Sequence, residues 1–344
     1  MRVAELTAPR AFRLESRDIA GPAPGEIQVR VGAVGICGSD LHAYAEGAIG
    51  DTPCQYPMVL GHEPAGTVVQ TGPGVTGWSA GDRAALEPAL YCYHCEYCRA
   101  GRYNICANLR FLSNPGDPGF FRERINLPAA NLVALPAHVS LELGALIEPL
   151  AVALHSMQLA ALGGGETVAV FGAGPIGLLT IACLKAAEAG RIWAVEPVPH
   201  RRELARLLGA AAALDPAEAE GQILSDTRGR GVDCAFDCAA RDETTNKAIR
   251  CARPGGRVVL TGIHSRASIR FETSPMRRKE LAFFNVRRSN RESSLALEML
   301  ARHPDWFAPL LTHVRPLDRI GDAFSIAKTY SDGVGKMIVR PSEE

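Results

Sequence analysis

Residues 168–179, VAVFGAGPIGLL, join four apolar residues to a glycine-rich turn and then to a second apolar run. The turn has the spacing G-x-G-x-x-G, which at the junction of a strand and a helix lets the backbone turn tightly and approach a pyrophosphate closely. The positive N-terminus of the helix also favours phosphate groups. This stretch therefore predicts an α/β domain that binds a dinucleotide. The residues expected to contact the nucleotide are Gly172, Gly174, Pro175, Ile176 and Gly177.

A carboxylate follows this turn at the end of the next apolar run, RIWAVE (191–196). At the end of that strand Glu196 can accept hydrogen bonds from the hydroxyls of the adenosine ribose and repel a 2′-phosphate, which favours NAD over NADP. Arg201 and Arg202 lie just downstream, and an arginine there can accommodate a phosphate. We therefore expect Arg201 to contribute to the cofactor site, and NADP stays open as the less favoured cofactor.

The pattern around the turn indicates two domains. From about residue 140, short apolar runs alternate with stretches rich in alanine and leucine, which is typical of a parallel sheet covered by helices. Before it, frequent prolines and glycines and an alternating run at 26–34 indicate short strands and loops. The 344 residues are enough for two cores. We expect a first domain at 1–145, completed by the tail at 287–344, and a nucleotide-binding domain at 146–286.

The charge balance argues against nucleic acid or an anionic membrane as a partner. The chain has 37 basic and 37 acidic residues, so no overall field would hold either of them. Its N-terminus has no apolar segment of the signal-peptide type. The apolar stretch 167–184 is interrupted by the glycines and proline of the turn, which indicates a strand followed by a helix and no membrane span. We expect a cytoplasmic protein that binds small molecules.

Four of the ten cysteines form a cluster with the spacing C-x2-C-x2-C-x7-C. Gaps of two residues let thiolates converge on one ion, and four sulfurs complete a closed tetrahedral zinc site with no position for a substrate. Disulfides are not expected in the cytosol, and an iron–sulfur cluster usually has a different cysteine spacing. We expect structural zinc on these residues: Cys92, Cys95, Cys98 and Cys106.

A second set of metal-binding residue types stands in two separate motifs, GICGSDLH (35–42) and GHE (61–63). Cys37, His62 and Glu63 offer sulfur, nitrogen and oxygen, a set suited to a catalytic zinc that keeps a position open for water or substrate. Each residue alone would more often be buried packing, but their joint occurrence favours a metal site. Ser39 and His42 are placed to pass a proton from a bound hydroxyl to solvent. For His42 a histidine without a catalytic role is the alternative.

Six segments, in order along nearly the whole chain, carry a resemblance to a known family. They are GICGSDLHAY (35–44), PMVLGHEPAG (57–66), GDRAALEPALYCYHCEYC (81–98), RAGRYNIC (99–106), IEPLAVALH (147–155) and VFGAGPIG (170–177). Together they resemble the zinc-containing medium-chain dehydrogenases, in particular the polyol (sorbitol-type) branch. The resemblance implies a GroES-like β-rich catalytic domain and a doubly wound Rossmann domain, with substrate in the cleft. It also implies two zinc ions per chain, NAD, and a homo-oligomer, either a dimer or a tetramer.

The resemblance adds two residues to the expected site. Glu148, in IEPL, matches the place where the polyol branch carries a glutamate near the metal, so it becomes a candidate metal ligand and catalytic residue. From the residues alone Glu148 is an acid in the first turn of a helix, favourable to the helix dipole, and this alternative stays open. Arg288, in NVRRSN (285–290), matches an arginine near the cofactor and substrate.

We therefore expect a hydride transfer from a secondary alcohol, namely a polyol, sugar or cyclitol, to NAD+. Sorbitol itself is not implied, because Ser289 stands where sorbitol dehydrogenases usually have an aromatic residue, and Pro64 and the segment GFFRERI (119–125) also depart from the pattern. Three alternatives stay open. They are an amino-alcohol dehydrogenase similar to L-threonine 3-dehydrogenase, an NADP-linked aldehyde reductase, and a non-catalytic zinc-binding protein on the same fold.

Overall fold

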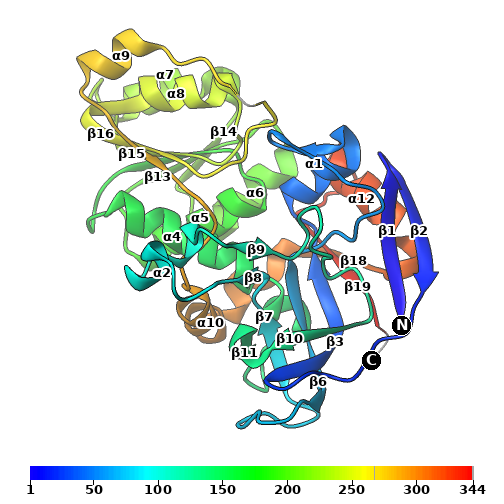
Figure 1. Ribbon diagram of the computed structural model, residues 1–344. Coiled ribbons are helices and arrows are strands. Elements are labelled where there is room, and N and C mark those ends of the chain that lie inside the picture. The colour runs from blue at the N-terminus through cyan, green and yellow to red at the C-terminus, as the bar shows by residue number, and fades with distance from the viewer. Residues whose placement is uncertain (267, 343–344) are drawn as a thin grey trace. The chain divides into compact units, whose positions relative to one another are not determined.

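The computed structural model describes residues 1–266 and 268–342, and these form two compact units (Figure 1). The first unit contains residues 1–148 and 293–344, and the second contains residues 149–292. Each unit has its own cluster of buried apolar side chains. The chain therefore builds two cores, and the first of them uses both ends of the sequence.

The second unit is a six-stranded parallel sheet with helices packed against it (Figure 1). In spatial order the strands are β14 (Ala212–Leu214), β13 (Ile192–Val195), β12 (Val168–Phe171), β15 (Val232–Asp237), β16 (Ala252–Leu260) and β17 (Ala282–Asn285). Every residue of β12, β13 and β15 is buried, as expected of a parallel sheet covered on both faces. This arrangement confirms the predicted α/β fold class.

Most helices of the second unit follow a strand of this sheet in the sequence. The helices of this unit are α5 (Pro175–Ala186), α6 (Pro199–Leu208), α7 (Pro216–Asp226), α8 (Asp242–Cys251) and α9 (Thr273–Arg278), together with most of α4 (Ile147–Ala160). Proline stands in the first turn of α5, α6 and α7, where its fixed φ suits the helix and its missing N–H costs no hydrogen bond. Each of these three helices therefore begins at its proline residue.

The first unit is built on a seven-stranded mixed sheet. In spatial order its strands are β11 (Leu132–Ala134), β7 (Arg83–Leu86), β6 (Glu63–Thr71), β3 (Glu26–Gly35), β19 (Lys336–Arg340) and β18 (Leu311–Pro316), with β10 (Arg124–Pro128) also paired to β3. Strand β3 pairs antiparallel with β6 on one side and with β19 on the other. The C-terminal tail is therefore part of the sheet that carries the first half of the chain.

Short elements complete the first unit. The remaining strands are β1 (Arg2–Ala8), β2 (Ala11–Ser16), β4 (Ala48–Ile49), β5 (Thr52–Pro53), β8 (Ala89–Leu90) and β9 (Arg110–Phe111). Its helices are α1 (Gly38–Glu46), α2 (Glu96–Arg99), α3 (Leu141–Gly144), α10 (Ser293–Arg302), α11 (Pro304–Phe307) and α12 (Ile320–Thr329), with 3-10 turns η1 (Tyr103–Ile105), η2 (Ala129–Asn131), η3 (Ala308–Leu310) and η4 (Leu317–Arg319).

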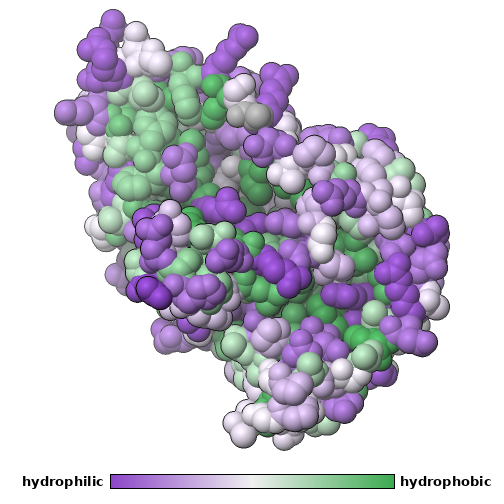
Figure 2. Space-filling view, viewed as in Figure 1, coloured by the Kyte–Doolittle hydropathy of each residue, from purple (hydrophilic) through white to green (hydrophobic). Residues whose placement is uncertain are grey.

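The apolar segments of the chain are core elements. The stretch 167–184 divides into β12, the glycine turn and α5. Residues Leu141–Ala160 are apolar and long enough to cross a membrane, but 67% of the most apolar 18-residue window in this segment is buried inside the protein, which is the behaviour of a core helix. Figure 2 shows hydrophilic residues spread over the visible surface.

We predict opposite stability effects for two glycine-to-alanine substitutions in the second unit. A Cβ on Gly177 would lie 1.9 Å from the carbonyl oxygen of Gly172, so G177A should destabilise by about 1–3 kcal/mol through overpacking. Gly221 is exposed within α7 and a Cβ there would meet no atom within 4 Å, so G221A should stabilise by about 0.5–1 kcal/mol. Denaturant unfolding followed by circular dichroism measures both. If the denaturant midpoint of G177A equals that of the parent, the close approach of Gly177 to the carbonyl oxygen of Gly172 is contradicted.

Candidate functional site

Three of the predicted metal ligands come together in the first unit. Cys37 stands just before α1, His62 lies in the loop before β6, and Glu63 is the first residue of β6. One ligand atom from each of these side chains lies within 4.8 Å of the others, and both His62 and Glu63 are buried. The pairing of β3 with β6 places Gly35 opposite Glu63, so the sheet brings the two motifs side by side.

Asp40 fixes the histidine of this group. Its carboxylate is fully buried and accepts hydrogen bonds from the backbone N–H of Cys37 (3.1 Å), the backbone N–H of Gly61 (3.2 Å) and the hydroxyl of Ser113 (3.3 Å). Nδ1 of His62 lies 3.4 Å from Oδ1 of Asp40. Burial alone would raise the pKa of Asp40, but His62 and these N–H groups hold it below its usual value. Asp40 therefore stays ionised and sets the position of the imidazole.

The charge around His62 suits a cation. Burial alone would lower the pKa of His62, but the negative charges of Asp40 and Cys37 hold it well above the usual value. Nδ1 of His62 is buried and, apart from its ion pair with Asp40, makes no hydrogen bond within residues 1–266 and 268–342. A sulfur, an imidazole and a carboxylate within reach of one point are the donors of a catalytic zinc site. The residues present therefore fit a zinc ion.

Two of the expected proton-transfer residues, Ser39 and His42, stand on α1. The hydroxyl of Ser39 is buried and lies 3.5 Å from Nε2 of His62. One turn further, Nδ1 of His42 lies 2.9 Å from Glu46, and Glu46 also pairs with Lys328 of α12 at 3.2 Å. Burial alone would raise the pKa of Glu46, but His42 and Lys328 hold it below the usual value. Glu46 therefore fixes the ring of His42 from its Nδ1 side.

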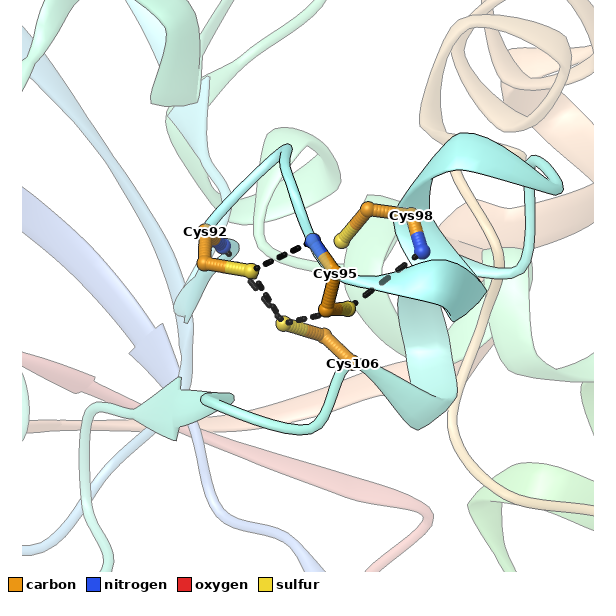
Figure 3. A group of neighbouring side chains, drawn as sticks. All are labelled: Cys92, Cys95, Cys98 and Cys106. Carbon is orange, nitrogen blue, oxygen red and sulfur yellow. Dashed lines mark hydrogen bonds between the residues drawn. The ribbon is translucent and has the colours of Figure 1, made fainter.

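The four-cysteine cluster forms a separate site in the first unit (Figure 3). The sulfurs converge from the turn at 92–95, from α2 and from the end of η1, and their ligand atoms lie within 4.8 Å of one another. Cys106 Sγ lies 3.5 Å from Cys92 Sγ, and Cys95 Sγ lies 3.9 Å from Cys106 Sγ. His94 is not among these ligand atoms, and its Nδ1 lies 2.6 Å from the carbonyl oxygen of Cys92. The four cysteines fit a second zinc ion.

Local hydrogen bonds prepare this cluster for metal binding. The backbone N–H groups of Cys95 and Cys98 point at the sulfurs of Cys92 (3.4 Å) and Cys95 (3.5 Å). Hydrogen bonding, chiefly from the backbone of His94, lowers the pKa of Cys92 to about 5, whereas burial raises the pKa of Cys98 to about 12. A divalent cation bound by the four sulfurs favours their thiolate forms.

The nucleotide turn of the second unit uses each glycine differently. Gly172 has φ of 94°, and a Cβ there would lie 2.8 Å from the Cβ of Ala239. A Cβ on Gly177 would overlap the carbonyl oxygen of Gly172. At Gly174 the nearest atom to such a Cβ is a guanidinium nitrogen of Arg201 at 3.9 Å. The backbone is therefore open at Gly174, at the start of α5, where a pyrophosphate is expected.

The residues after β13 arrange their charges around this turn. Glu196 is buried and accepts hydrogen bonds from the N–H of Ala173 (2.7 Å) and the N–H of Val198 (3.0 Å). Arg202 donates to the carbonyl oxygens of Glu196 and Pro197, at 2.7 and 2.9 Å. It also contacts Asp215 at 3.2 Å. Arg202 is therefore occupied by the loop itself, and the buried Arg201 is the arginine that faces the glycine turn.

Two further expected residues lie in α4 and in a loop of the second unit. Glu148 is half-buried in the first turn of α4, and the group of mutually close ligand atoms does not include it. Arg288 is half-buried and has a φ of 56°, in a loop of the second unit. That loop is fixed by Glu292, which accepts a hydrogen bond from the N–H of Asn290 and pairs with His155 of α4 at 2.9 Å. Their roles at the site stay predictions.

Three residues that contact the expected site residues were not identified from the sequence. Asp40 carried a signal, because an acid three residues after Cys37 suits the first turn of a helix. Glu46 carried another, because it is four residues after His42 on the same helix face. Lys336, whose ammonium pairs with Glu63, carried none, because the two residues meet only through the folding of the sheet.

The match to known families covers both units. Residues 23–137 match a family described as alcohol dehydrogenase GroES-like domain, and residues 175–302 match a family described as zinc-binding dehydrogenase. These matches agree with the β-rich first unit, with its two candidate zinc sites, and with the Rossmann-type sheet of the second.

Similar proteins extend the match over nearly the whole chain. A sorbitol dehydrogenase of Bacillus subtilis (strain 168) is 32% identical over 99% of this chain and 98% of its own length. A probable D-xylulose reductase A of Emericella nidulans is 37% identical over 92% of this chain and 90% of its own. The crystal structure of 2R,3R-butanediol dehydrogenase from Bacillus subtilis has a TM-score of 0.88 and 32% identity over 99% of both chains. The chain therefore belongs to the zinc-containing medium-chain alcohol dehydrogenase family, and it is a zinc-dependent, NAD(P)-linked enzyme of the alcohol and polyol dehydrogenase type.

Proposed function

We propose that the enzyme oxidises a secondary alcohol of the polyol, sugar or cyclitol class and uses NAD+ as the hydride acceptor. The observation that carries this proposal is the group formed by Cys37, His62 and Glu63, with the hydroxyl of Ser39 at 3.5 Å from His62. A mixed donor set of three protein ligands leaves a position for a substrate hydroxyl. The Bacillus relative named a sorbitol dehydrogenase supports the polyol class.

Zinc held by Cys37, His62 and Glu63 would supply Lewis acidity to a bound alcohol. The overall reaction would convert a secondary alcohol and NAD+ into a ketone, NADH and one proton. In this proposal the hydroxyl of Ser39 accepts the proton and His42 carries it towards solvent. Glu46 holds Nδ1 of His42 at 2.9 Å, so the other ring nitrogen is left for the transfer.

The remaining roles concern cofactor and substrate. We assign the pyrophosphate to the turn from Gly172 to Gly177, with Arg201 as its cationic partner, and the adenosine ribose to Glu196. A carboxylate has about four acceptor positions, and the backbone N–H groups of Ala173 and Val198 take two at Glu196. Acceptor positions are thus left for the ribose hydroxyls. Pro175 and Ile176 belong to the same turn, and Arg288 is assigned to the cofactor.

Glu148 is proposed as a further carboxylate of the catalytic metal centre. It stands in the first unit, at the beginning of α4. A second carboxylate can bind the metal or accept hydrogen bonds from neighbouring substrate hydroxyls. Either role favours a substrate with several hydroxyl groups over a simple alcohol. Oligomerisation as a dimer or tetramer is part of the same proposal, as is a cytoplasmic location.

The proposed reaction predicts NAD+ reduction with at least one member of a panel of polyols, sugars and cyclitols, measured at 340 nm, in preference to amino alcohols.

Replacing Cys37 or His62 by alanine should lower kcat by about 10³-fold or more, because the Lewis acid is lost. Zinc measured per chain should fall from two ions to one, while NADH still binds in a fluorescence titration. Undiminished turnover by a C37A enzyme that contains only one zinc would contradict the proposal.

The four-cysteine cluster, called the cysteine lobe from here on, should respond to substitution in a different way. C98S removes one of four sulfurs from the closed site, so one zinc should be lost and the melting temperature should fall by about 5 °C or more. Cobalt or zinc bound at the Cys37 group should be retained. C54S is the matched control, because Cys54 lies outside both ligand groups. A C98S protein with two zinc ions and the parent melting temperature would exclude a structural role for the lobe.

The cofactor preference should depend on the charge of Glu196. E196Q keeps the shape of the side chain but removes the negative charge that repels a 2′-phosphate. The ratio of the NADPH and NADH dissociation constants should therefore shift towards NADPH by about tenfold, which corresponds to about 1.4 kcal/mol. E203Q, at an exposed position on α6, serves as control. The assignment of Glu196 to the ribose fails if E196Q and E203Q give the same ratio as the parent.

A further inference from the structure

Lys336 is a buried cation at the catalytic metal centre that the mechanism above does not use. It is the first residue of β19, and the relative exposure of its side chain is 1%, equal to that of Glu63. Its ammonium forms an ion pair with Oε2 of Glu63 and donates a hydrogen bond to the carbonyl oxygen of Ile36 at 3.0 Å. A lysine is rarely buried unless it is paired. The burial of Lys336 therefore depends on its contact with Glu63.

The sheet places this ion pair directly over β3. Gly35 of β3 pairs with Glu63 of β6 on one side and with Ile338 of β19 on the other. A Cβ on Gly35 would lie 2.0 Å from Oε2 of Glu63 and 2.7 Å from Cε of Lys336. The missing side chain at Gly35 therefore provides the space in which the carboxylate and the ammonium meet. The backbone of Ile36, which Lys336 also contacts, leads directly to Cys37.

The charges around the metal centre give Lys336 a chemical role. With zinc bound, the thiolate of Cys37 and the carboxylates of Asp40 and Glu63 carry three negative charges, and Lys336 is a buried cation beside Glu63. The metal ion and Lys336 together offset these three charges, and buried charges are tolerated when they are paired. Without Lys336, the carboxylate of Glu63 would lose its ammonium partner.

We propose that Lys336 is a positioning residue that shares Glu63 with the catalytic zinc and so keeps this carboxylate a weak, displaceable ligand. The inference rests on the proposed function, in which Cys37, His62 and Glu63 bind that zinc. A carboxylate held by an ammonium gives less of its charge to the metal, so water or the alcohol competes with it more easily. Removing the ammonium frees Glu63 to bind the metal fully and to hinder substrate binding.

Cobalt substitution tests this directly, because the absorption bands of Co²⁺ report its ligands without any turnover. Both metal sites are loaded with Co²⁺, and the spectrum of the C37A protein is subtracted to remove the contribution of the cysteine lobe. In K336M the remaining bands should shift, and release of the metal to a chelator should slow by about tenfold, as expected for loss of one charged hydrogen bond. The KM for the alcohol should rise while the Kd for NADH is unchanged.

Three further variants make the test specific. K336R keeps the positive charge and should restore the parent spectrum and release rate. In the E63Q background, K336M should have no further effect on release, since the shared carboxylate is already gone. K185M, at an exposed lysine of the second unit, should leave spectrum and release unchanged.

Specific results would overturn the proposal. One is a K336M protein with the parent spectrum and release rate, and another is an equal effect of K336M with and without Glu63. If K336M does not fold, E63D makes the same test, because its shorter side chain cannot reach the ammonium and the metal together, and an unchanged spectrum there would also overturn it. If C37A leaves the cobalt spectrum intact, the proposed function itself fails, so the two failures are distinguishable.

Discussion

The pairing of β3 with β6 and β19 is the constraint on which the metal centre of the first unit depends. Gly35 is paired to both neighbours, so residues from the beginning, the first third and the end of the chain meet at one point. Side chains alternate between the two faces of a sheet, and a slip of one residue would turn Glu63 or Lys336 to the other face. The register of these strands therefore determines which groups surround the metal, and the C-terminal tail is needed for the site as much as the motifs are.

The parts of the protein that could be predicted from sequence are those in which neighbours along the chain are also neighbours in space. The cysteine spacing from Cys92 to Cys106 brings four sulfurs together within one turn-rich segment, and the glycine spacing from Gly172 to Gly177 describes one strand-to-helix turn. Both expectations needed only local geometry. The α/β fold class followed from the alternation of strands and helices, since each βα step repeats the same local pattern.

The rest depends on contacts between distant segments. Lys336 lies 300 residues from Ile36, to which it donates a hydrogen bond, and nothing in the local sequence KMIVRP (336–341) indicates a charged residue in the core. The hydrogen bond between Ser113 and Asp40 likewise joins a turn to helix α1, and the sequence does not relate the two segments. Substrate choice lies further still from prediction, because the residues that line a substrate pocket stand on loops whose shapes the local sequence does not determine.

The two metal sites differ in what holds them, and this explains why the clearer sequence motif carries less of the function. In the lobe the ligands are four like groups, and their number leaves no place for a substrate. At the Cys37 group the protein provides three unlike ligands, a buried carboxylate that orients one of them, and an ammonium that pairs with another. The negative charges that raise the pKa of His62 also attract the metal. Zinc binds only the neutral imidazole, so a proton and the metal ion compete for the same imidazole ring. In our proposal, the ammonium beside Glu63 keeps this site weak enough to exchange water for an alcohol, a property that a closed set of four thiolates lacks.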